Sequence, residues 1–347
     1  MIPIDLLFLL APPILLVGGG VAAFWSRERR LKAWNAAAER NGLIASSKTL
    51  GQLPVLFGTV QGHDVEVRVV RRGGGKNKAS FTVVRTHLSI PVPAGLEVSR
   101  DHLLGKLVTA MGGQDIPLAD PGLDKKLKVK GQSPQAIQDL LDIGVVRPAM
   151  QRFFALGQYS RLEGAEVIAD RRGIQTDAGL DEMLASAIGL VNAMSEGRER
   201  AWKDLAERHG LERSGDPSTQ LSGEQAGVAV QVESTGSQTQ LTVHIRDFDP
   251  RVRICAGDGG FVERDPILGN RVCITGDAAT LPKLFGPAQL DALRGELMQV
   301  FETWPDTRLR DGRLDATLQG EPYRTLDAML GDYRSLAEAL RRAAGGP

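Results

Sequence analysis

The sequence contains the same helix-forming segment twice, and this duplication constrains the fold more than any other feature. Residues 33–43 read AWNAAAERNGL and residues 201–211 read AWKDLAERHGL. In each segment the tryptophan and the alanine four positions later share one face of an amphipathic helix. A glycine, Gly42 or Gly210, then stands where a helix commonly ends. Two copies of one fold are therefore expected in a single chain.

Further matches follow in the same order along both copies. The spacing Leu-x-Gly-x-x-x-Gly-x-x-Val-x-Val begins at Leu56 and again at Leu221. The later matched pairs are Thr82-Val83 with Thr242-Val243, Asp120-Pro121 with Asp265-Pro266, and Pro148-Ala149 with Pro287-Ala288. This order predicts a tandem duplication, with one repeat over 27–197 and the other over 198–347. No long linker separates them.

Each repeat combines strands with helices. Val65, Val67 and Val69 alternate with Glu66 and Arg68, which is the period of a half-buried strand. We expect strands near 56–60, 64–70, 80–90 and 125–129, and helices over 134–141, 177–195, 278–285 and 323–343. Runs of strands beside helices predict an α+β fold in which each repeat is an antiparallel sheet with flanking helices.

Residues 6–25 carry no charge and are numerous enough to cross a membrane. A helix rises about 1.5 Å per residue, so about 20 apolar residues span a hydrocarbon core roughly 30 Å thick. A cleaved signal peptide would need positive residues ahead of the apolar core, where the only charged residue is Asp5. A buried core helix would usually keep one polar stripe. We therefore predict a transmembrane helix over residues 1–26, followed by the two repeats.

The positive residues near this segment all follow it, and an excess of Lys and Arg beside a span stays on the cytoplasmic side. The predicted localisation is the cell membrane, with a single pass, the N-terminus outside and the repeats in the cytoplasm. A periplasmic domain behind an uncleaved signal is the alternative. The residues expected to contact lipid headgroups are Trp25, Arg27, Arg29, Arg30 and Lys32.

The predicted span contains residues suited to packing against another helix. Two adjacent prolines remove backbone donors in mid-span, and small residues allow a second helix to approach closely. The partner would be another membrane protein or a second copy of this chain. The packing residues are Pro12, Pro13, Gly18, Gly19, Ala22 and Ala23.

The net charge of zero hides two halves of opposite sign. Residues 26–197 contain 23 Lys and Arg against 18 Asp and Glu, whereas residues 198–347 contain 19 against 23. In the first half Lys126, Lys128 and Lys130 alternate with Leu127 and Val129, which places the lysines on one strand face. Such a face either binds an anionic lipid surface or is simply solvated. Aromatic residues do not interleave the basic runs, so nucleic acid is not an expected partner.

The sequence lacks the motifs that would identify a catalytic or metal site. It contains no His-Glu-x-x-His, Gly-x-Ser-x-Gly or Cys-x-x-Cys spacing. Residues 73–76 read Gly-Gly-Gly-Lys, but Asn77 replaces the Ser or Thr of a phosphate loop, and a hairpin turn is favoured. Cys255 and Cys273 are too few for a disulfide framework or a four-ligand zinc site, and we expect reduced core thiols. No cofactor is predicted.

The histidines and the polar residues shared by both copies are the remaining candidate site residues. None of the five histidines, in our alignment, recurs at the equivalent position of the other copy. His63 beside Asp64, and His244 near Asp247 and Asp249, could support acid–base chemistry, although polar residues in alternating strands usually form a solvated face. The polar residues shared by both copies are Glu39/Glu207, Arg40/Arg208 and Asp120/Asp265, and they fit helix surfaces and turns.

These observations predict a non-catalytic, single-pass membrane protein. Its duplicated cytoplasmic α+β domain would act as a protein-interaction module or as an accessory subunit of a membrane complex. Repeats of opposite charge would meet different partners. The alternative is an enzyme or small-ligand-binding module with a site in the cleft between the repeats. A buried His63 or His244 beside a carboxylate would favour that alternative. The expected partners are membrane lipids and a membrane protein or second copy, and no small-molecule ligand is identified.

Overall fold

The computed structural model describes residues 28–46, 53–74, 78–100, 115–215, 219–225, 227–257, 260–262, 265 and 267–345. Contacts divide the chain into two compact units. Unit 1 comprises residues 1–89 and 149–192, and unit 2 comprises residues 90–148 and 193–347. The units are defined by contacts in space rather than by sequence similarity. The repeat boundaries at 27–197 and 198–347 therefore stay a prediction.

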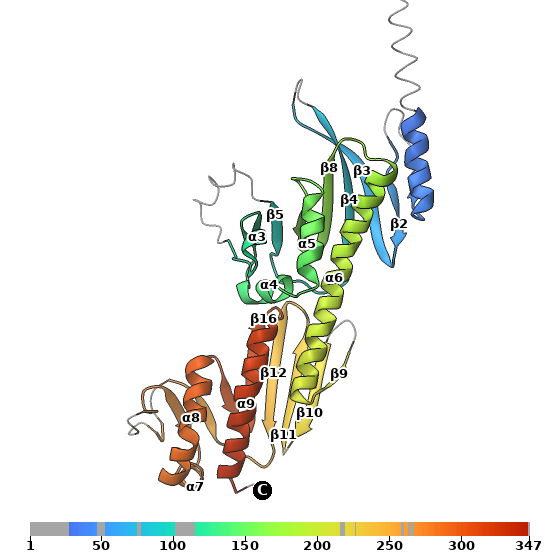
Figure 1. Ribbon diagram of the computed structural model, residues 1–347. Helices are drawn as coiled ribbons and strands as arrows, with labels where there is room; N and C mark the ends of the chain where they lie inside the picture. Colours follow the sequence, from blue (N-terminus) through green and yellow to red (C-terminus); the bar gives the residue numbers. More distant parts are fainter. Residues whose placement is uncertain are drawn as a thin grey trace, which may run out of the picture. The chain divides into compact units, whose positions relative to one another are not determined.

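Unit 1 contains an antiparallel sheet with strands in the order β1-β2-β3-β4-β8-β7. The strands are β1 (Ile44–Ala45), β2 (Leu56–Val60), β3 (His63–Arg72), β4 (Ala79–His87), β7 (Arg161–Glu163) and β8 (Glu166–Arg172). A helix over 28–40 lies beside β2 (Figure 1). The end of α5 (Val146–Ala155) and the first part of α6 (Asp177–His209) complete the unit.

The core of unit 1 combines alternate strand residues with one side of each helix. In β3 the side chains of Val65 and Val67 are buried while Asp64 is exposed, as the period of two predicts. Trp34 of the first helix is fully buried, and its indole Nε1 donates a hydrogen bond to the Pro54 carbonyl at 3.0 Å. Burying a large apolar side chain of this kind contributes about 1.5–3 kcal/mol.

Unit 2 contains an antiparallel sheet with strands in the order β14-β13-β15-β16-β12-β11-β10-β9. These strands are β9 (Glu212–Ser214), β10 (Thr219–Gln225), β11 (Val228–Ser234), β12 (Gln238–Ile245), β13 (Arg253–Ala256), β14 (Val272–Thr275), β15 (Arg308–Arg310) and β16 (Arg313–Gln319). Its helices include α7 (Leu281–Leu284), α8 (Pro287–Thr303) and α9 (Tyr323–Ala343). The antiparallel pair of β5 (Glu97–Arg100) and β6 (Leu127–Lys130) also belongs to unit 2, as do the helices α3 (Pro121–Asp124) and α4 (Pro134–Leu141).

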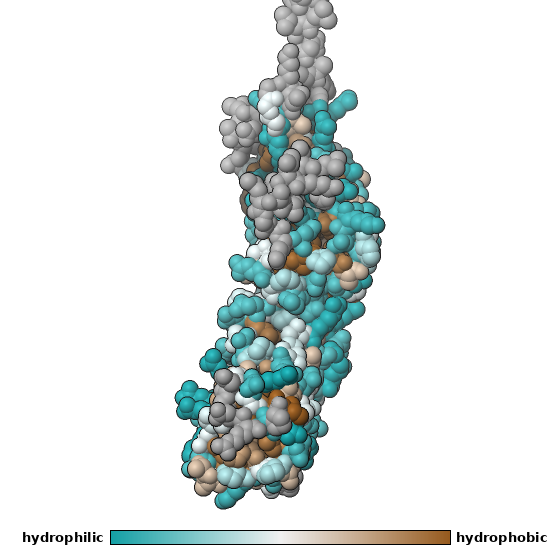
Figure 2. All heavy atoms as spheres, turned by 90° about the vertical axis from the view of Figure 1, so that its left-hand side faces the viewer, coloured by the Kyte–Doolittle hydropathy of each residue, from teal (hydrophilic) through white to brown (hydrophobic). Residues whose placement is uncertain are grey.

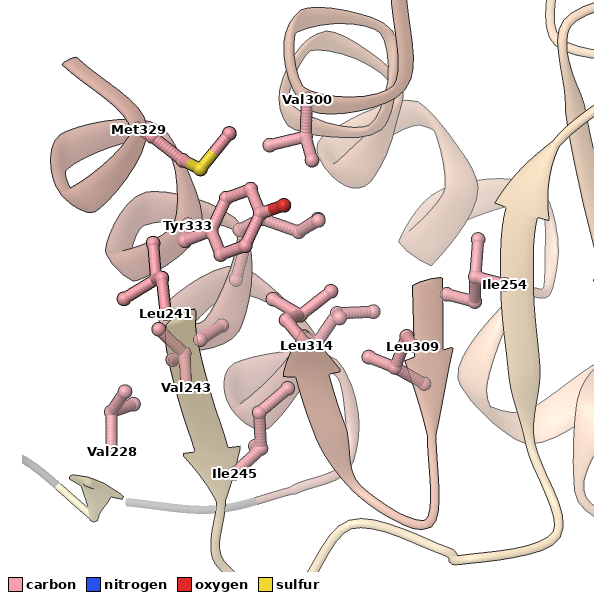
Figure 3. Close-up of a cluster of buried hydrophobic side chains, with 14 of the residues drawn as sticks. Val228, Leu241, Val243, Ile245, Ile254, Val300, Leu309, Leu314, Met329 and Tyr333 are labelled. Carbon is pink, nitrogen blue, oxygen red and sulfur yellow. The ribbon is translucent and has the colours of Figure 1, made fainter. Parts of the chain in front are cut away.

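The core of unit 2 forms where α8 and α9 pack on this sheet. In Figure 3, Tyr333 and Met329 of α9 lie on the side of the sheet toward which Leu241 and Leu314 point, with Val300 of α8 nearby. All five side chains are at most 3% exposed. The Tyr333 hydroxyl is hydrogen-bonded to that of Thr307, so the buried polar group of the tyrosine has a partner.

Several predicted helices have the expected bounds. The structure confirms the helices over 134–141, as α4, and over 323–343, as α9. A proline in the first turn of α4 and of α8 fits the preference for proline where no backbone donor is needed. The helix predicted over 278–285 is shorter, because only Leu281–Leu284 is helical.

The helix predicted over 177–195 is longer than expected. It continues without interruption into the tryptophan-containing segment of the second repeat, so both form the single helix α6. Residues of α6 up to Asn192 belong to unit 1, and those from Ala193 onward belong to unit 2. The absence of a linker at 195–198 is explained by this continuous helix.

Strand pairing corrects one part of the sequence alignment. Gly58 pairs with Val65 in unit 1 and Gly223 pairs with Val230 in unit 2, as the matched glycines predict. However, Val65 pairs on its other side with Thr86, whereas Val230 pairs with Val243. The counterpart of Val243 is therefore Thr86, and the predicted match with Val83 was three residues off. A shift of an odd number of residues exchanges the faces of a strand, so this correction changes which residues are equivalent.

The predicted fold class was wrong in its membrane component. The α+β class and the antiparallel sheets are present. Among the residues that the structure describes, however, no helix is both long enough and apolar enough to span a membrane. The 33-residue α6 is long, but charged residues are distributed along it. The predicted span over 1–26 itself lies outside the described residues.

Candidate functional site

The outward face of the unit 1 sheet contains a hollow of about 440 Å³, here called the unit 1 hollow. Residues of β2, β3 and β4 line it, together with the first residue of β8. Three carboxylates, Asp64, Glu66 and Glu166, face Arg85 and His87 there. The excess of acidic groups is opposite in sign to the net charge of the first half of the chain. A local surface can thus differ from the charge of the segment that contains it.

A second hollow, of about 770 Å³, lies on the outward face of the unit 2 sheet and is called the unit 2 hollow. It is lined mainly by polar residues of β10, β11 and β12, with Glu212 and Arg313 at its borders. His244 of β12 is exposed within it. Neither hollow buries its histidine.

Strand register shows that the two hollows occupy equivalent positions. His87 of β4 pairs with Glu166 of β8, and His244 of β12 pairs with Arg313 of β16. Since Thr86 and Val243 are counterparts, His87 and His244 are counterparts too. The expectation that no histidine recurs was therefore wrong. The Nε2 atom of His87 is 3.8 Å from Oε1 of Glu166, whereas His244 in unit 2 lies opposite the cationic Arg313.

An exposed apolar pair distinguishes unit 1 from unit 2. Ile44 of the edge strand β1 pairs with Phe57 of β2, and the two residues are 64% and 46% exposed. Phe57 also lines the unit 1 hollow, so the pair and the hollow form one surface. At the corresponding pairing in unit 2, Glu212 lies opposite Ser222. In the view of Figure 2, the described surface is mostly hydrophilic with small separate apolar areas.

The shared arginines Arg40 and Arg208 each bind a carboxylate. Arg40 and its neighbour Asn41 both donate to the Asp181 carboxylate, at 3.1 and 2.8 Å. In unit 2, Arg208 and His209 make the same pair of contacts with Asp327. In both units a carboxylate thus holds the C-terminal end of the tryptophan helix. Sequence comparison identified the arginines, but the two aspartates were missed because they lie far along the chain.

The shared aspartates Asp120 and Asp265 hold turns. Oδ1 of Asp120 accepts hydrogen bonds from the backbone N–H groups of Gly122 and Leu123, and Oδ1 of Asp265 accepts from those of Ile267 and Leu268. Although partial burial opposes it, these bonds and Arg294 lower the pKa of Asp265. This is the capping role expected for Asp before a short helix or turn.

We expect His209→Asn to leave stability unchanged within about 0.5 kcal/mol, because Asn41 fills the same position in unit 1. Asp327→Ala should lower the free energy of unfolding by about 1 kcal/mol, since it removes both contacts at a partly exposed site. Urea unfolding of the two variants and the parent measures this difference. A larger loss for His209→Asn than for Asp327→Ala would contradict the structural role.

The remaining candidate residues do not assemble a reactive group. His63 is only partly buried, and its ring is hydrogen-bonded to the Asn192 amide at 2.6 Å rather than to a carboxylate. His244 is exposed. In the described parts of the chain, no cluster of three His, Cys, Asp or Glu residues has a metal-binding arrangement.

The lysines of β6 lie on the face opposite the buried Leu127 and Val129, as predicted. The ammonium nitrogen of Lys130 is 3.1 Å from a carboxylate oxygen of Glu97.

The predicted membrane residues are only partly described. Arg29, Arg30 and Lys32 are exposed on the helix over 28–40, and their contact with lipid stays a prediction. The other residues of that prediction lie outside the described residues. They are Pro12, Pro13, Gly18, Gly19, Ala22, Ala23, Trp25 and Arg27.

Unit 2 contains a buried ion pair that the sequence did not reveal. Arg198 and Glu321 are 6% and 7% exposed, and two guanidinium nitrogens donate to the two carboxylate oxygens at 2.7 and 2.6 Å. Arg198 also donates to the Thr219 hydroxyl at 3.0 Å. Such bidentate, charge-assisted pairs fix geometry strongly.

Further hydrogen bonds complete the surroundings of Glu321. Its carboxylate accepts from the hydroxyls of Ser234 and Tyr323, at 2.6 and 2.7 Å, and from the Trp202 indole at 3.4 Å. Burial alone would raise the pKa of Glu321, but Arg198 and these hydroxyls outweigh it and lower the pKa. Glu321 is therefore held as a carboxylate inside the protein.

Unit 1 has no such pair at the corresponding position. The Thr82 hydroxyl donates to the Gly173 carbonyl and the Thr239 hydroxyl donates to the Gly320 carbonyl, which identifies the two glycines as counterparts. The residue after Gly173 is Ile174, where unit 2 has Glu321. The ion pair is thus a feature of unit 2 rather than of the common fold.

Comparison with known proteins gives little further information. No known family model and no curated protein matches the chain. Among solved structures, the chain is similar to the crystal structure of the mycobacterial trehalose monomycolate transport factor A, TtfA. The identity is 19%, the match covers 42% of this chain and 95% of that chain, and the TM-score is 0.26. At this TM-score the match supports no inference about function.

Proposed function

We propose that the chain is a non-catalytic accessory protein whose unit 1 binds an extended segment of a partner protein. The single observation that carries this proposal is the exposed pair Ile44–Phe57, which lies on the sheet edge beside the unit 1 hollow. Apolar residues exposed together beside polar ones are typical of protein-interaction surfaces. The same fold in unit 2 has Glu212 and Ser222 there, so the fold does not require the apolar pair.

The geometry favours an extended partner segment. β1 is the outermost strand of the order β1-β2-β3-β4-β8-β7, and an edge strand can pair with a further strand. Side chains of such a segment would alternate between the two sheet faces. Those on the outward face would contact Ile44 and Phe57. The acidic residues of the hollow, Asp64, Glu66 and Glu166, favour basic residues in the partner.

Photo-crosslinking in the native cells tests this proposal. A photoreactive amino acid placed at Thr59, which also lines the hollow, should give one discrete adduct with a partner protein. The same amino acid at Glu224, the counterpart of Thr59 in unit 2, is the matched control and should not give that adduct. Equal adducts at both positions, or none at Thr59, would contradict the proposal.

A double variant provides the second test. Ile44→Glu with Phe57→Ser gives unit 1 the residues that unit 2 has at this pairing. Each buried apolar side chain contributes about 1.5–3 kcal/mol to an interface, so the yield of the Thr59 adduct should fall by about tenfold or more. Thermal unfolding should be nearly unchanged, because both side chains are exposed. An unchanged adduct yield would show that the partner binds elsewhere.

A further inference from the structure

The chain has two cysteines, and the structure places them directly opposite each other. Cys255 of β13 pairs with Cys273 of β14 in an antiparallel register. Both are thiols in this structure, and both are partly exposed. The sequence predicted reduced core thiols rather than a bridge, because both residues lie in apolar, strand-like segments. Their juxtaposition is a property of the register alone.

The Cα separation expected for this register lies within the range that disulfides span. Two residues along the ladder, the Gly257 N–H donates to the Arg271 carbonyl at 3.0 Å. Hydrogen-bonded pairs recur at every second residue in an antiparallel ladder, so the cysteines also form such a pair, with Cα atoms about 5.5 Å apart. Disulfides join Cα atoms about 4.4–6.8 Å apart.

Both thiols lie on the same, outward face of the strands. Residues directly opposite in an antiparallel pair point to the same side. The adjacent pair, Ile254 with Ile274, is fully buried and points to the other side, into the core. The two cysteines thus lie on the face away from the core, where both residues are partly exposed.

The thiols are not required by the common fold. Leu127, Val129 and Gly131 of the first repeat have the same spacing as Val272, Ile274 and Gly276 of the second, so Val129 matches Ile274. In the β5–β6 pair, Val98 lies opposite Val129, and the next pair is Ser99 with Lys128. The first repeat thus has a hydroxyl and a cation in the β5–β6 pair where the second repeat has two thiols in the β13–β14 pair. The pair of opposed cysteines is therefore a specific feature of β13 and β14.

We propose that Cys255 and Cys273 form a reversible intramolecular disulfide, with glutathione disulfide as the oxidant. One thiolate attacks glutathione disulfide, which forms a mixed disulfide and releases one glutathione thiolate. The second cysteine thiolate attacks the mixed disulfide and releases the other glutathione thiolate. Two protons leave the cysteines and are taken up by the glutathione thiolates, so two electrons pass from the protein to glutathione. The product joins β13 covalently to β14.

The experiment incubates the reduced full-length protein with defined mixtures of glutathione and glutathione disulfide. We expect the loss of both thiols with the same midpoint, a mass decrease of two hydrogen atoms, and a linked peptide containing both cysteines. The oxidised protein should also show slower hydrogen exchange in β13 and β14 and a higher Tm, because the link restricts the unfolded chain. Reduction should reverse these changes.

The single variants Cys255→Ser and Cys273→Ser are the controls. Each should lose the linked peptide and the rise in Tm on oxidation, while keeping the Tm of the reduced parent. Stable glutathione adducts on the parent protein, or a disulfide between two molecules, would overturn the proposal. A rise in Tm that persists in either single variant would also overturn it.

Discussion

Glu321→Ala is expected to lower the free energy of unfolding by about 3–5 kcal/mol, because it leaves the buried Arg198 guanidinium without its counter-charge. It also removes the acceptor of the Ser234 and Tyr323 hydroxyls. Urea unfolding measures the loss, and hydrogen exchange should locate it in unit 2. Ile174→Ala at the counterpart position in unit 1 is the matched control, and it should cost less because no charge is left unpaired. Equal losses at the two positions would contradict this account.

The same pair predicts a pH dependence. The pKa of Glu321 is lowered in the folded protein. A carboxyl group of this kind stabilises the fold above its ordinary pKa of about 4.3, and the contribution is lost as the pH falls through the lowered value. The difference in stability between the parent and Glu321→Gln should therefore be largest near neutral pH and should decrease in acid. A difference that grows in acid would show that the carboxyl is not held ionised.

Trp34→Ala and Trp202→Ala should each cost about 3–5 kcal/mol, because both side chains are fully buried. The effects should be separate, with loss of hydrogen-exchange protection in unit 1 for Trp34 and in unit 2 for Trp202. Trp304→Ala is the control: this residue is only partly buried, and its indole donates to Asp332 at 2.9 Å. If either core variant were no more destabilised than Trp304→Ala, the tryptophan concerned would not be an important part of the core of its unit.

Much of the architecture follows from local patterns in the sequence. The alternation in β3 gives a half-buried strand, and the heptad-like spacing of Leu326, Met329, Leu330 and Tyr333 gives the buried side of α9. The matched segments also predicted the shared register of β2–β3 and β10–β11. These features depend on neighbouring residues only, which is why the sequence was sufficient.

The equivalent histidines could not be identified in the same way. β3 has 10 residues whereas its counterpart β11 has 7, so the two hairpins differ in length. The dipeptide Thr-Val occurs in both β4 and β12, but at positions that are not equivalent. Matching these dipeptides therefore gave the wrong register for the two strands. The positions of His87 and His244 became clear only from the backbone pairing.

The buried pair and the exposed pair depend on distant contacts. Arg198 and Glu321 are separated by more than a hundred residues, and Ile44 lies opposite Phe57 only because β1 pairs with β2. Residue type alone does not distinguish an exposed isoleucine from one in the core, or a buried glutamate from one on the surface. Only the three-dimensional packing shows that each is in the opposite environment.

The continuity of α6 has a consequence for dissecting the chain. The boundary suggested by sequence similarity, at residue 198, falls within this helix and at the arginine of the buried ion pair. A fragment beginning at Arg198 would place a new, charged amino terminus on the residue that pairs with Glu321, and it would leave the first backbone N–H groups of the shortened helix without helical partners. The two predicted repeats cannot therefore be separated at residue 198 without removing the helical residues that precede the buried ion pair.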